Sequence, residues 1–189
     1  VGTSFILSTY KITKPYLLYV GAAYPHKNLD GLLEAWKLFQ EKYGTAYQLL
    51  LVGKENFFYN KLKQKIEKES IDVIYTGFVP DDELSNLYKN STLYVFPSLY
   101  EGFGLPPLEA MIHAAPVVSS NASCLPEVLQ DAALYFDPHK SEEMADTIYK
   151  GITEDPTRLK LQENAQKLLP KYSWDTLAKQ TLDCYTRGY

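Results

Sequence analysis

The chain has 189 residues, of which 46% are hydrophobic and 22% are charged, and its formal net charge is −4. This length suits a single globular domain with its own core, and the acidic balance argues against broad electrostatic binding to nucleic acid. No window approaches the ~18 apolar residues of a transmembrane helix, and the first residues lack a signal-peptide pattern. The two cysteines, Cys124 and Cys184, indicate a reducing compartment. We therefore expect a cytoplasmic globular protein.

Short apolar runs recur along the chain, separated by longer amphipathic segments. Residues 1–15 are expected to form a lead-in that ends at Lys14-Pro15. After it, apolar runs without polar alternation predict strands that are buried on both faces, and the first three of these runs are closed by glycine. The predicted strands cover residues 16–21, 47–53, 72–77, 92–98, 116–120 and 132–138.

Helical patterns fill the segments between these strands. Asn28 is expected to cap a helix whose apolar face includes Trp36. Charged residues around a few apolar positions predict an exposed helix over residues 57–69, and the acids at 81–83 suit the first turn of another helix. The remaining helices are expected from about Pro107 to Ala114, from Ser141 onward, and over about 173–186, where Ser173 is the expected cap.

This alternation is typical of an α/β fold. It predicts a Rossmann-like, doubly wound parallel sheet of about six strands with helices on both faces, within one domain over residues 16–189. In such a fold, ligands bind in the crevice beyond the carboxyl ends of the strands. The loops that matter for function are therefore expected to be residues 21–28, 53–56, 77–82, 97–107 and 120–124.

The familiar cofactor motifs are missing from the sequence. Gly53-Lys54-Glu55 lacks the upstream Gly and the following Ser or Thr of a Walker loop, and Gly102-Phe103-Gly104 lacks the third Gly of a dinucleotide fingerprint. No His/Cys cluster has zinc spacing, and no Asp-x-Asp pair occurs. We expect neither a metal nor a cofactor.

The stretch EGFGLPPLEAM, residues 101–111, follows the fourth predicted strand and combines two acids with glycine and proline. Its glycines let the backbone approach a ligand, and the helix that begins near Pro107 presents its positive end, which favours phosphate. The carboxylates of Glu101 and Glu109 suit paired sugar hydroxyls. Glu109 is expected in the first helical turn, where a purely structural role is equally common. The combination predicts a site for a ligand that carries phosphates and sugars.

Three further loops at strand ends carry candidate residues. Lys27 can reach phosphates from its place between a strand and a helix, and a solvated lysine is the alternative. Phe78 and Val79 can cover a flat base, while packing on the core has equal weight for this loop. Asn121 and Ser123 lie in another small-residue loop and can touch a sugar.

Four segments resemble one known family. They are YVGAAYPHKNLDGLLEAW, LLLVGKE, IYTGFVPDDELSNLYKNSTLYVFPSLYEGFGLPPLEAM and APVVSSNASCLPEVLQDAALYFDP. They are similar to the carboxyl-terminal, donor-binding domain of family 4 (group 1) retaining glycosyltransferases of the GT-B type, from about Tyr16 to the end of the chain. The motif that carries the resemblance most specifically is the pair Glu101 and Glu109 with seven residues between them.

The resemblance implies a reaction and a set of roles. A hexose-type sugar would pass from a nucleoside-diphosphate sugar to a glycan, polysaccharide or lipid-linked acceptor, with retention at the anomeric carbon and without a metal. The resemblance implies catalytic roles for Glu101 beside the donor sugar and for Lys27 on the diphosphate, and it places Glu109 on the ribose. Further donor contacts are implied for Gly21, Phe78, Val79, Phe103, Gly104, Leu105 and Asn121.

The resemblance also implies partners. In this family an amino-terminal domain, which has no counterpart in this chain, holds most of the acceptor site, so the isolated chain is expected to be inactive. That domain would also carry any peripheral association with the inner face of the membrane. No nucleic-acid partner is expected.

Two alternatives stay open at this point. Many family members carry a basic residue where this chain has Ala22. This departure, together with the missing domain, allows a nucleotide-binding module without catalytic activity of its own. A receiver or flavodoxin-like protein is a third reading, and the lack of an acidic phosphoacceptor pocket argues against it.

Overall fold

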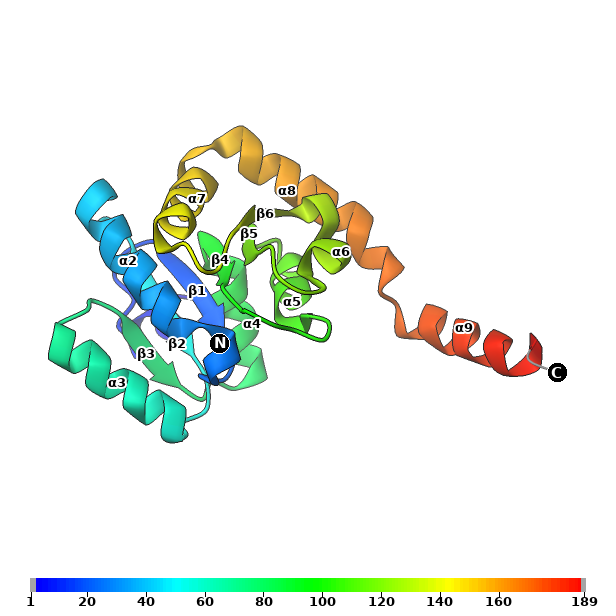
Figure 1. Ribbon diagram of the computed structural model, residues 1–189, viewed down its shortest axis with the longest axis horizontal. Helices are drawn as coiled ribbons and strands as arrows, with labels where there is room; N and C mark the ends of the chain where they lie inside the picture. Colours follow the sequence, from blue (N-terminus) through cyan, green and yellow to red (C-terminus); the bar gives the residue numbers. More distant parts are fainter. Residues whose placement is uncertain (1–2, 188–189) are drawn as a thin grey trace.

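The computed structural model describes residues 3–187, and its centre is a parallel β-sheet (Figure 1). The order of strands across the sheet is β3-β2-β1-β4-β5-β6, and each neighbouring pair is parallel. All six predicted strands are confirmed, and with them the doubly wound α/β class. The strands are β1 (Tyr16–Val20), β2 (Gln48–Val52), β3 (Ile74–Gly77), β4 (Leu93–Phe96), β5 (Val117–Ser120) and β6 (Ala133–Phe136).

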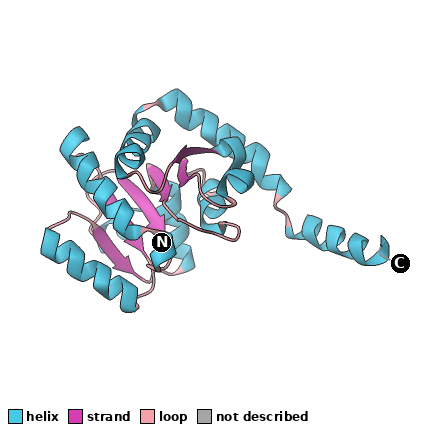
Figure 2. Ribbon diagram, in the orientation of Figure 1, coloured by secondary structure: helices cyan, strands magenta, loops and turns pink. Residues whose placement is uncertain are grey.

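Helices surround this sheet (Figure 2). They are α1 (Thr3–Thr9), α2 (Leu29–Tyr43), α3 (Phe57–Glu69), α4 (Asp81–Asn90), α5 (Leu105–Ile112), α6 (Leu125–Leu129), α7 (Ser141–Thr153), α8 (Asp155–Leu168) and α9 (Trp174–Arg187), with 3-10 turns η1 (Pro25–Lys27), η2 (Gln130–Ala132) and η3 (Leu169–Lys171). Helix α2 packs beside α7, α1 beside α4, and α5 beside α8.

The helices bury both faces of the sheet. Every residue of β4 and β5 is buried, including Ser119 and Ser120. Trp36 of α2 is fully buried, and its indole Nε1 donates a hydrogen bond to the Asp72 carbonyl at 2.7 Å. Coverage of both faces explains why β1, β2 and β4 are apolar runs without polar alternation, whereas the residues of the edge strand β3 are only partly buried.

The start of α2 differs from the sequence-based expectation. Asn28 occupies the N-cap position but has a left-handed backbone, with φ 57°, and its side chain does not cap the helix. Its Nδ2 instead donates to the carbonyls of Pro97 and Pro138, at 3.1 and 2.9 Å. Asn28 is therefore the N-cap residue, and its carbonyl accepts the Leu32 N–H at 3.1 Å, but the expected cap through its side chain does not form. The side chain instead ties the start of α2 to two other loops.

The start of α5 also differs from the expectation. The helix begins at Leu105, two residues before Pro107. Both Pro106 and Pro107 fit its first turn, where a missing N–H costs no helical hydrogen bond. Glu109 consequently lies in the second turn and not in the first, so the alternative role of a helix-capping acid does not apply to it.

The lead-in over residues 1–15 contains helix α1. Ile6 is buried, and the Tyr10 hydroxyl donates to Glu83 of α4 at 2.6 Å. The predicted boundaries 1–15 and 16–189 also reach residues 1–2 and 188–189, which lie outside the described residues. The division between lead-in and domain stays a prediction.

Helix α9 confirms the last predicted helix and projects away from the body of the molecule (Figure 1). The Ser173 hydroxyl accepts the Thr176 N–H at 3.5 Å, a long contact for a cap. Every side chain of α9 is exposed, and Trp174 is 80% exposed. Across the described part of the chain, no helix has the length and apolar character to cross a bilayer.

Candidate functional site

The crevice predicted from the topology lies where β1 and β4 are neighbours. The chain runs from β1 outward to β3 and then returns to place β4 on the other side of β1. Ligands of doubly wound folds bind beyond the carboxyl ends of the strands at such a switch point. Here the loops after β1 and β4 are joined, because the Leu99 N–H donates to the His26 carbonyl at 2.8 Å. The two loops therefore form one continuous rim.

An ion pair crosses this rim. Lys27 Nζ lies 2.7 Å from Glu101 Oε1, and the two side chains are only 18% and 11% exposed. Lys27 Nζ is also 5.7 Å from the centre of the Phe96 ring, within the range of a cation–π contact. The structure thus brings together the two residues for which the resemblance implied catalytic roles.

The glycine loop after Glu101 leaves backbone donors free. The amides of residues 102–104 donate to no other group within residues 3–187. Gly104 has φ 92°, and a Cβ at this position would lie 2.8 Å from Leu125 Cδ2, so the position requires glycine. A Cβ at Gly102 would meet open space. The required glycine stands at the start of α5, where free N–H groups and the helix dipole both favour an anion.

Glu109 is held from the side by a residue that sequence reasoning did not single out. Its Oε2 accepts a hydrogen bond of 3.1 Å from the hydroxyl of Tyr88 on α4. Glu109 is exposed, whereas Tyr88 is 2% exposed. Burial, and to a smaller extent the negative charge of Glu109, raises the pKa of the Tyr88 phenol. Tyr88 is therefore a neutral donor throughout the physiological range.

Tyrosine hydroxyls also donate hydrogen bonds to the backbone carbonyls at the ends of β1 and β2. We call Tyr19, Tyr59, Tyr75 and Tyr94 the tyrosine network. Gly21 belongs to the same arrangement, because its φ is 152° and a Cβ there would lie 2.8 Å from the Tyr19 hydroxyl. Within the network, Tyr19 donates to the Ala22 carbonyl and Tyr59 to the Gly21 carbonyl, both at 2.8 Å. Tyr75 donates to the Gly53 carbonyl at 2.8 Å, and Tyr94 donates to the Val20 carbonyl at 3.3 Å.

The loop after β3 separates its two candidate residues. Phe78 is 70% exposed, so its ring is available to a flat ligand. Val79 is 3% exposed and packs in the hydrophobic core, which is the alternative weighed for this loop. Any contact between Val79 and a ligand would therefore involve its backbone.

The remaining candidates surround the same edge of the sheet. Phe103 is 41% exposed and packs edge-on against Tyr172, with ring centres 5.4 Å apart. Leu105 is 54% exposed at the first position of α5. Asn121 directly follows β5 and is exposed. Ser123, in the same loop, is held by a hydrogen bond of 2.7 Å from its hydroxyl to the Glu101 carbonyl.

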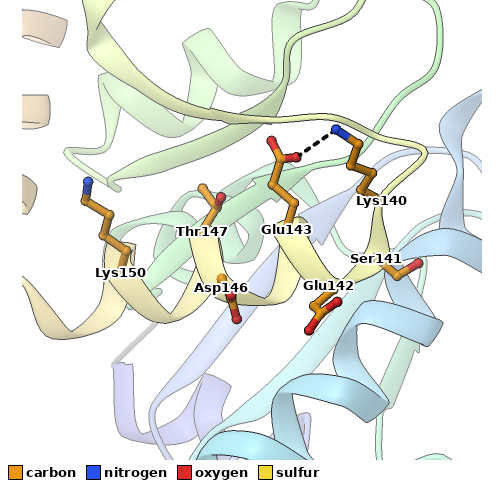
Figure 3. A pocket seen from close by; sticks show the side chains of 7 residues that line it. All are labelled: Lys140, Ser141, Glu142, Glu143, Asp146, Thr147 and Lys150. Carbon is orange, nitrogen blue, oxygen red and sulfur yellow. Dashed lines mark ion pairs between the residues drawn. The ribbon is translucent and has the colours of Figure 1, made fainter.

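A surface depression runs along α7 (Figure 3). Its lining carries two lysines and three acids, and Lys140 Nζ lies 3.5 Å from Glu143 and 3.4 Å from Asp137. No predicted site residue lines it, and within residues 3–187 no three His, Cys, Asp or Glu side chains gather as metal ligands would. We attach no function to this depression. Its lining residues are Lys140, Ser141, Glu142, Glu143, Asp146, Thr147 and Lys150.

Sequence reasoning missed Tyr88 and the bridging role of Asn28. Tyr88 follows Leu84 and Leu87 on one side of α4, a spacing that indicates core packing and hides a polar task. Its partner Glu109 is 21 positions away along the chain. Only the folded arrangement reveals such a pair, because the local pattern around Tyr88 carries no signal for it.

The fold and the rim together define a Rossmann-like α/β protein whose site suits a phosphorylated ligand with several hydroxyls. Residues 8–168 match the family model for glycosyl transferases group 1. The chain belongs to the glycosyl transferase group 1 family.

Relatives and solved structures agree with this assignment. The chain is 36% identical over 183 residues to an O-antigen chain mannosyltransferase B of Escherichia coli, covering 95% of this chain and 48% of that protein. It is 32% identical over 184 residues to a serotype-specific mannosyltransferase of Escherichia coli, covering 94% and 22%. A sucrose-phosphate synthase structure from Thermosynechococcus elongatus matches with a TM-score of 0.82 at 22% identity, covering 97% of this chain and 48% of that one.

The chain is much shorter than the relatives that it matches. It spans about half the length of the first mannosyltransferase and about a fifth of the second. The expectation that the fold is one half of a GT-B arrangement agrees with the structural match, which likewise covers about half of the matched chain.

Proposed function

We propose that this chain is the donor-binding half of a retaining glycosyltransferase. It would take a hexose-type sugar from a nucleoside-diphosphate sugar for transfer to a glycan, polysaccharide or lipid-linked acceptor. Family membership supports sugar transfer as the reaction class. The names of the two mannosyltransferase relatives favour mannose as the hexose.

The observation that carries the proposal is the Lys27–Glu101 ion pair beside free amides. A diphosphate needs a cation and several N–H donors, and Lys27, the amides of residues 102–104 and the first turn of α5 supply both. Glu109 accepts hydrogen bonds from the hydroxyls of the ribose. The exposed Phe78 ring stacks on the base.

This arrangement suits the charge changes of glycosyl transfer. As the bond between sugar and diphosphate breaks, negative charge builds up on the leaving group. Fixed N–H donors and Lys27 stabilise that charge, and one such donor typically contributes ~3 kcal/mol in the transition state. Glu101, freed from Lys27 when the diphosphate binds, faces the cationic character that develops at the sugar ring. The proposal includes no metal and no other cofactor, since the sequence has no Asp-x-Asp pair to hold a metal with the diphosphate.

The proposal also includes a partner domain. The chain spans about half of its 36% identical relative, so the acceptor side would come from a further domain of a longer protein. We infer that the isolated chain binds donor without transferring sugar. The proposed location is the cytoplasm, with any peripheral association with the inner membrane made through that further domain.

Calorimetric titration of the purified chain tests the proposal directly. GDP, UDP, ADP and dTDP should be compared with the matching nucleosides and with pyrophosphate. At least one nucleoside diphosphate should bind more tightly than both its nucleoside and pyrophosphate, since the proposed contacts of the rim with the diphosphate, of Glu109 with the ribose and of Phe78 with the base act together. Lack of binding by all four diphosphates would overturn the donor-binding function.

One observation favours a second candidate, a nucleotide-binding module without catalysis. Ala22 follows Gly21 at a position where many group 1 enzymes carry a basic residue, so one cation for the diphosphate is missing here. Assay of the full-length gene product with labelled donors separates the two candidates. Sugar transfer or donor hydrolysis supports the enzyme, whereas donor binding without either reaction supports the module.

A further inference from the structure

The Glu109 carboxylate has a single anchor. Its side chain is exposed on α5, and within the described residues its one hydrogen bond is the contact of 3.1 Å between Oε2 and the Tyr88 hydroxyl. An exposed glutamate otherwise turns freely about several side-chain bonds, and fixing it costs entropy. The direction of this carboxylate therefore depends on Tyr88.

Tyr88 is well placed to serve as a rigid anchor. It is 2% exposed, and its ring lies against two other rings. The His113 ring is stacked on it, with centres 5.6 Å apart and planes 10° from parallel. The Tyr94 ring lies 5.6 Å away on β4. A ring packed in this way holds its hydroxyl at a fixed point.

The contact also differs from those of the other buried tyrosines. The hydroxyls of Tyr16, Tyr19, Tyr59 and Tyr94 all donate to backbone carbonyls. A buried hydroxyl needs a partner, and a carbonyl satisfies that need. Tyr88 instead donates to an exposed carboxylate at the ligand side of the sheet, so hydroxyl satisfaction alone does not explain its partner.

We propose that Tyr88 is a positioning residue that orients Glu109 for the ribose of the donor, an inference that rests on the proposed donor-binding function. Each carboxylate oxygen accepts two hydrogen bonds. With one site of Oε2 taken by Tyr88, one site of Oε2 and both sites of Oε1 stay available. An oriented carboxylate with free sites on both oxygens suits the two neighbouring hydroxyls of a ribose. Tyr88 thus makes the site select ribonucleotides over nucleotides without these hydroxyls.

A single-atom change tests the proposal in the full chain. Tyr88→Phe removes the hydroxyl and keeps the ring and its stacking on His113. GDP, UDP and ADP should be titrated beside their 2′,3′-dideoxy counterparts and pyrophosphate. The variant should weaken the tightest-binding ribonucleotide about tenfold, the usual effect of losing one hydrogen bond to a charged group. Its dideoxy counterpart and pyrophosphate should bind as they do to the unchanged chain.

Two further variants separate positioning from general destabilisation. In a Glu109→Ala background, adding Tyr88→Phe should cause no further loss, because the residue being oriented is gone. Tyr16→Phe is the matched control, since it removes another buried hydroxyl, one that contacts the Leu87 carbonyl. Tyr16→Phe should leave the preference for ribose unchanged.

The outcomes distinguish this inference from the proposed function. Suppose that the unchanged chain binds a ribonucleotide. If Tyr88→Phe then lowers the affinities for the ribonucleotide and for its dideoxy counterpart equally, or changes neither affinity, the positioning role is wrong and donor binding stands. A further loss in the Glu109→Ala background also contradicts positioning. If the unchanged chain binds no nucleoside diphosphate, the proposed function fails and this inference fails with it.

Discussion

Lys27 and Glu101 neutralise each other across the switch point of the sheet. Lys27 comes from the loop after β1, Glu101 comes from the loop after β4, and their charged atoms meet at 2.7 Å. Both side chains are largely shielded from water, so each needs a partner of opposite charge. A bound diphosphate would offer Lys27 a second partner of the same sign as Glu101. The pair therefore keeps both groups in place before a ligand arrives.

Removing the charge of Lys27 should weaken diphosphates selectively. Lys27→Met keeps most of the side-chain volume but leaves Glu101 unpaired at the rim, where its charge repels phosphate. We expect a loss of at least tenfold in affinity for nucleoside diphosphates and little change for nucleosides, measured by calorimetry. Lys42→Met is the control, because Lys42 also forms an ion pair, with Asp146 at 2.6 Å, but lies at the end of α2. Equal losses for nucleosides and diphosphates would remove Lys27 from the phosphate site.

The two glycines of the loop should respond differently to alanine. Gly104→Ala forces a side chain onto a left-handed backbone with φ 92° and into contact with Leu125. It should lower the free energy of unfolding by about 1–3 kcal/mol, seen by urea denaturation. Gly102→Ala meets open space and should change stability by less than about 0.5 kcal/mol. Similar costs at both positions would contradict the described loop conformation.

Alkaline pH should destabilise the protein through its buried phenols. Burial raises the pKa of Tyr16 and Tyr59, and burial together with the contact to Glu83 raises that of Tyr10 to about 12. Tyrosines in the unfolded chain ionise near pH ~10, whereas the buried ones in the folded protein do not. Above that pH, loss of these protons therefore stabilises the unfolded chain relative to the folded protein. Below pH ~10, the contribution of these phenols to the free energy of unfolding should not change with pH. It should fall above that pH by about 1.4 kcal/mol per pH unit for each buried phenol.

A single variant checks the origin of this alkaline decline. Tyr16→Phe removes one buried phenol, which donates to the Leu87 carbonyl at 2.7 Å. At pH 8 the variant should be about 1 kcal/mol less stable than the unchanged chain. Urea unfolding between about pH 10 and 11 should show a shallower decline for the variant. Identical slopes would mean that Tyr16 ionises as easily in the folded protein as in the unfolded chain.

Helix α9 should be dispensable for the stability of the rest of the chain. All of its side chains are exposed, so within residues 3–187 ending the chain at Ser173 removes no buried apolar side chain. The free energy of unfolding should change by less than about 1 kcal/mol in denaturant titrations. Leu161→Ala on α8 serves for comparison, because Leu161 is 5% exposed and its truncation should cost about 2–5 kcal/mol. A large loss on removal of α9 would show that it packs against the body in solution.

Much of the fold follows from local patterns in the sequence. All of the apolar runs became strands, and β4 is buried on both faces, whereas the edge strand β3 is only partly buried. Burial on both faces leaves a strong signal in the sequence. The loops of the site follow from topology, because parallel strands bring their carboxyl ends to one edge. Lys27 and Glu101 could be placed near each other for this reason, and the ion pair between them confirms that they are neighbours.

The remaining features depend on contacts between distant segments. Asn28 has the sequence context of a helix cap, yet its side chain binds the Pro97 and Pro138 carbonyls. Val79 and Phe78 are adjacent and both apolar, and only the packing of the loop decides that one is buried and the other exposed. The start of α5 at Leu105 could not be located from two prolines that both fit a first turn.

In the proposed donor site, the tyrosine network would affect how this acidic chain attracts an anion. Its phenols engage the oxygens at the ends of β1 and β2, while the amides of residues 102–104 stay free. A bound anion would then meet fixed peptide dipoles and the largely buried Lys27 at short range, and few exposed cations. Mobile ions in solution screen distant charges more than direct contacts. The affinity of the rim for phosphate groups should therefore depend only weakly on ionic strength, unlike that of a basic surface.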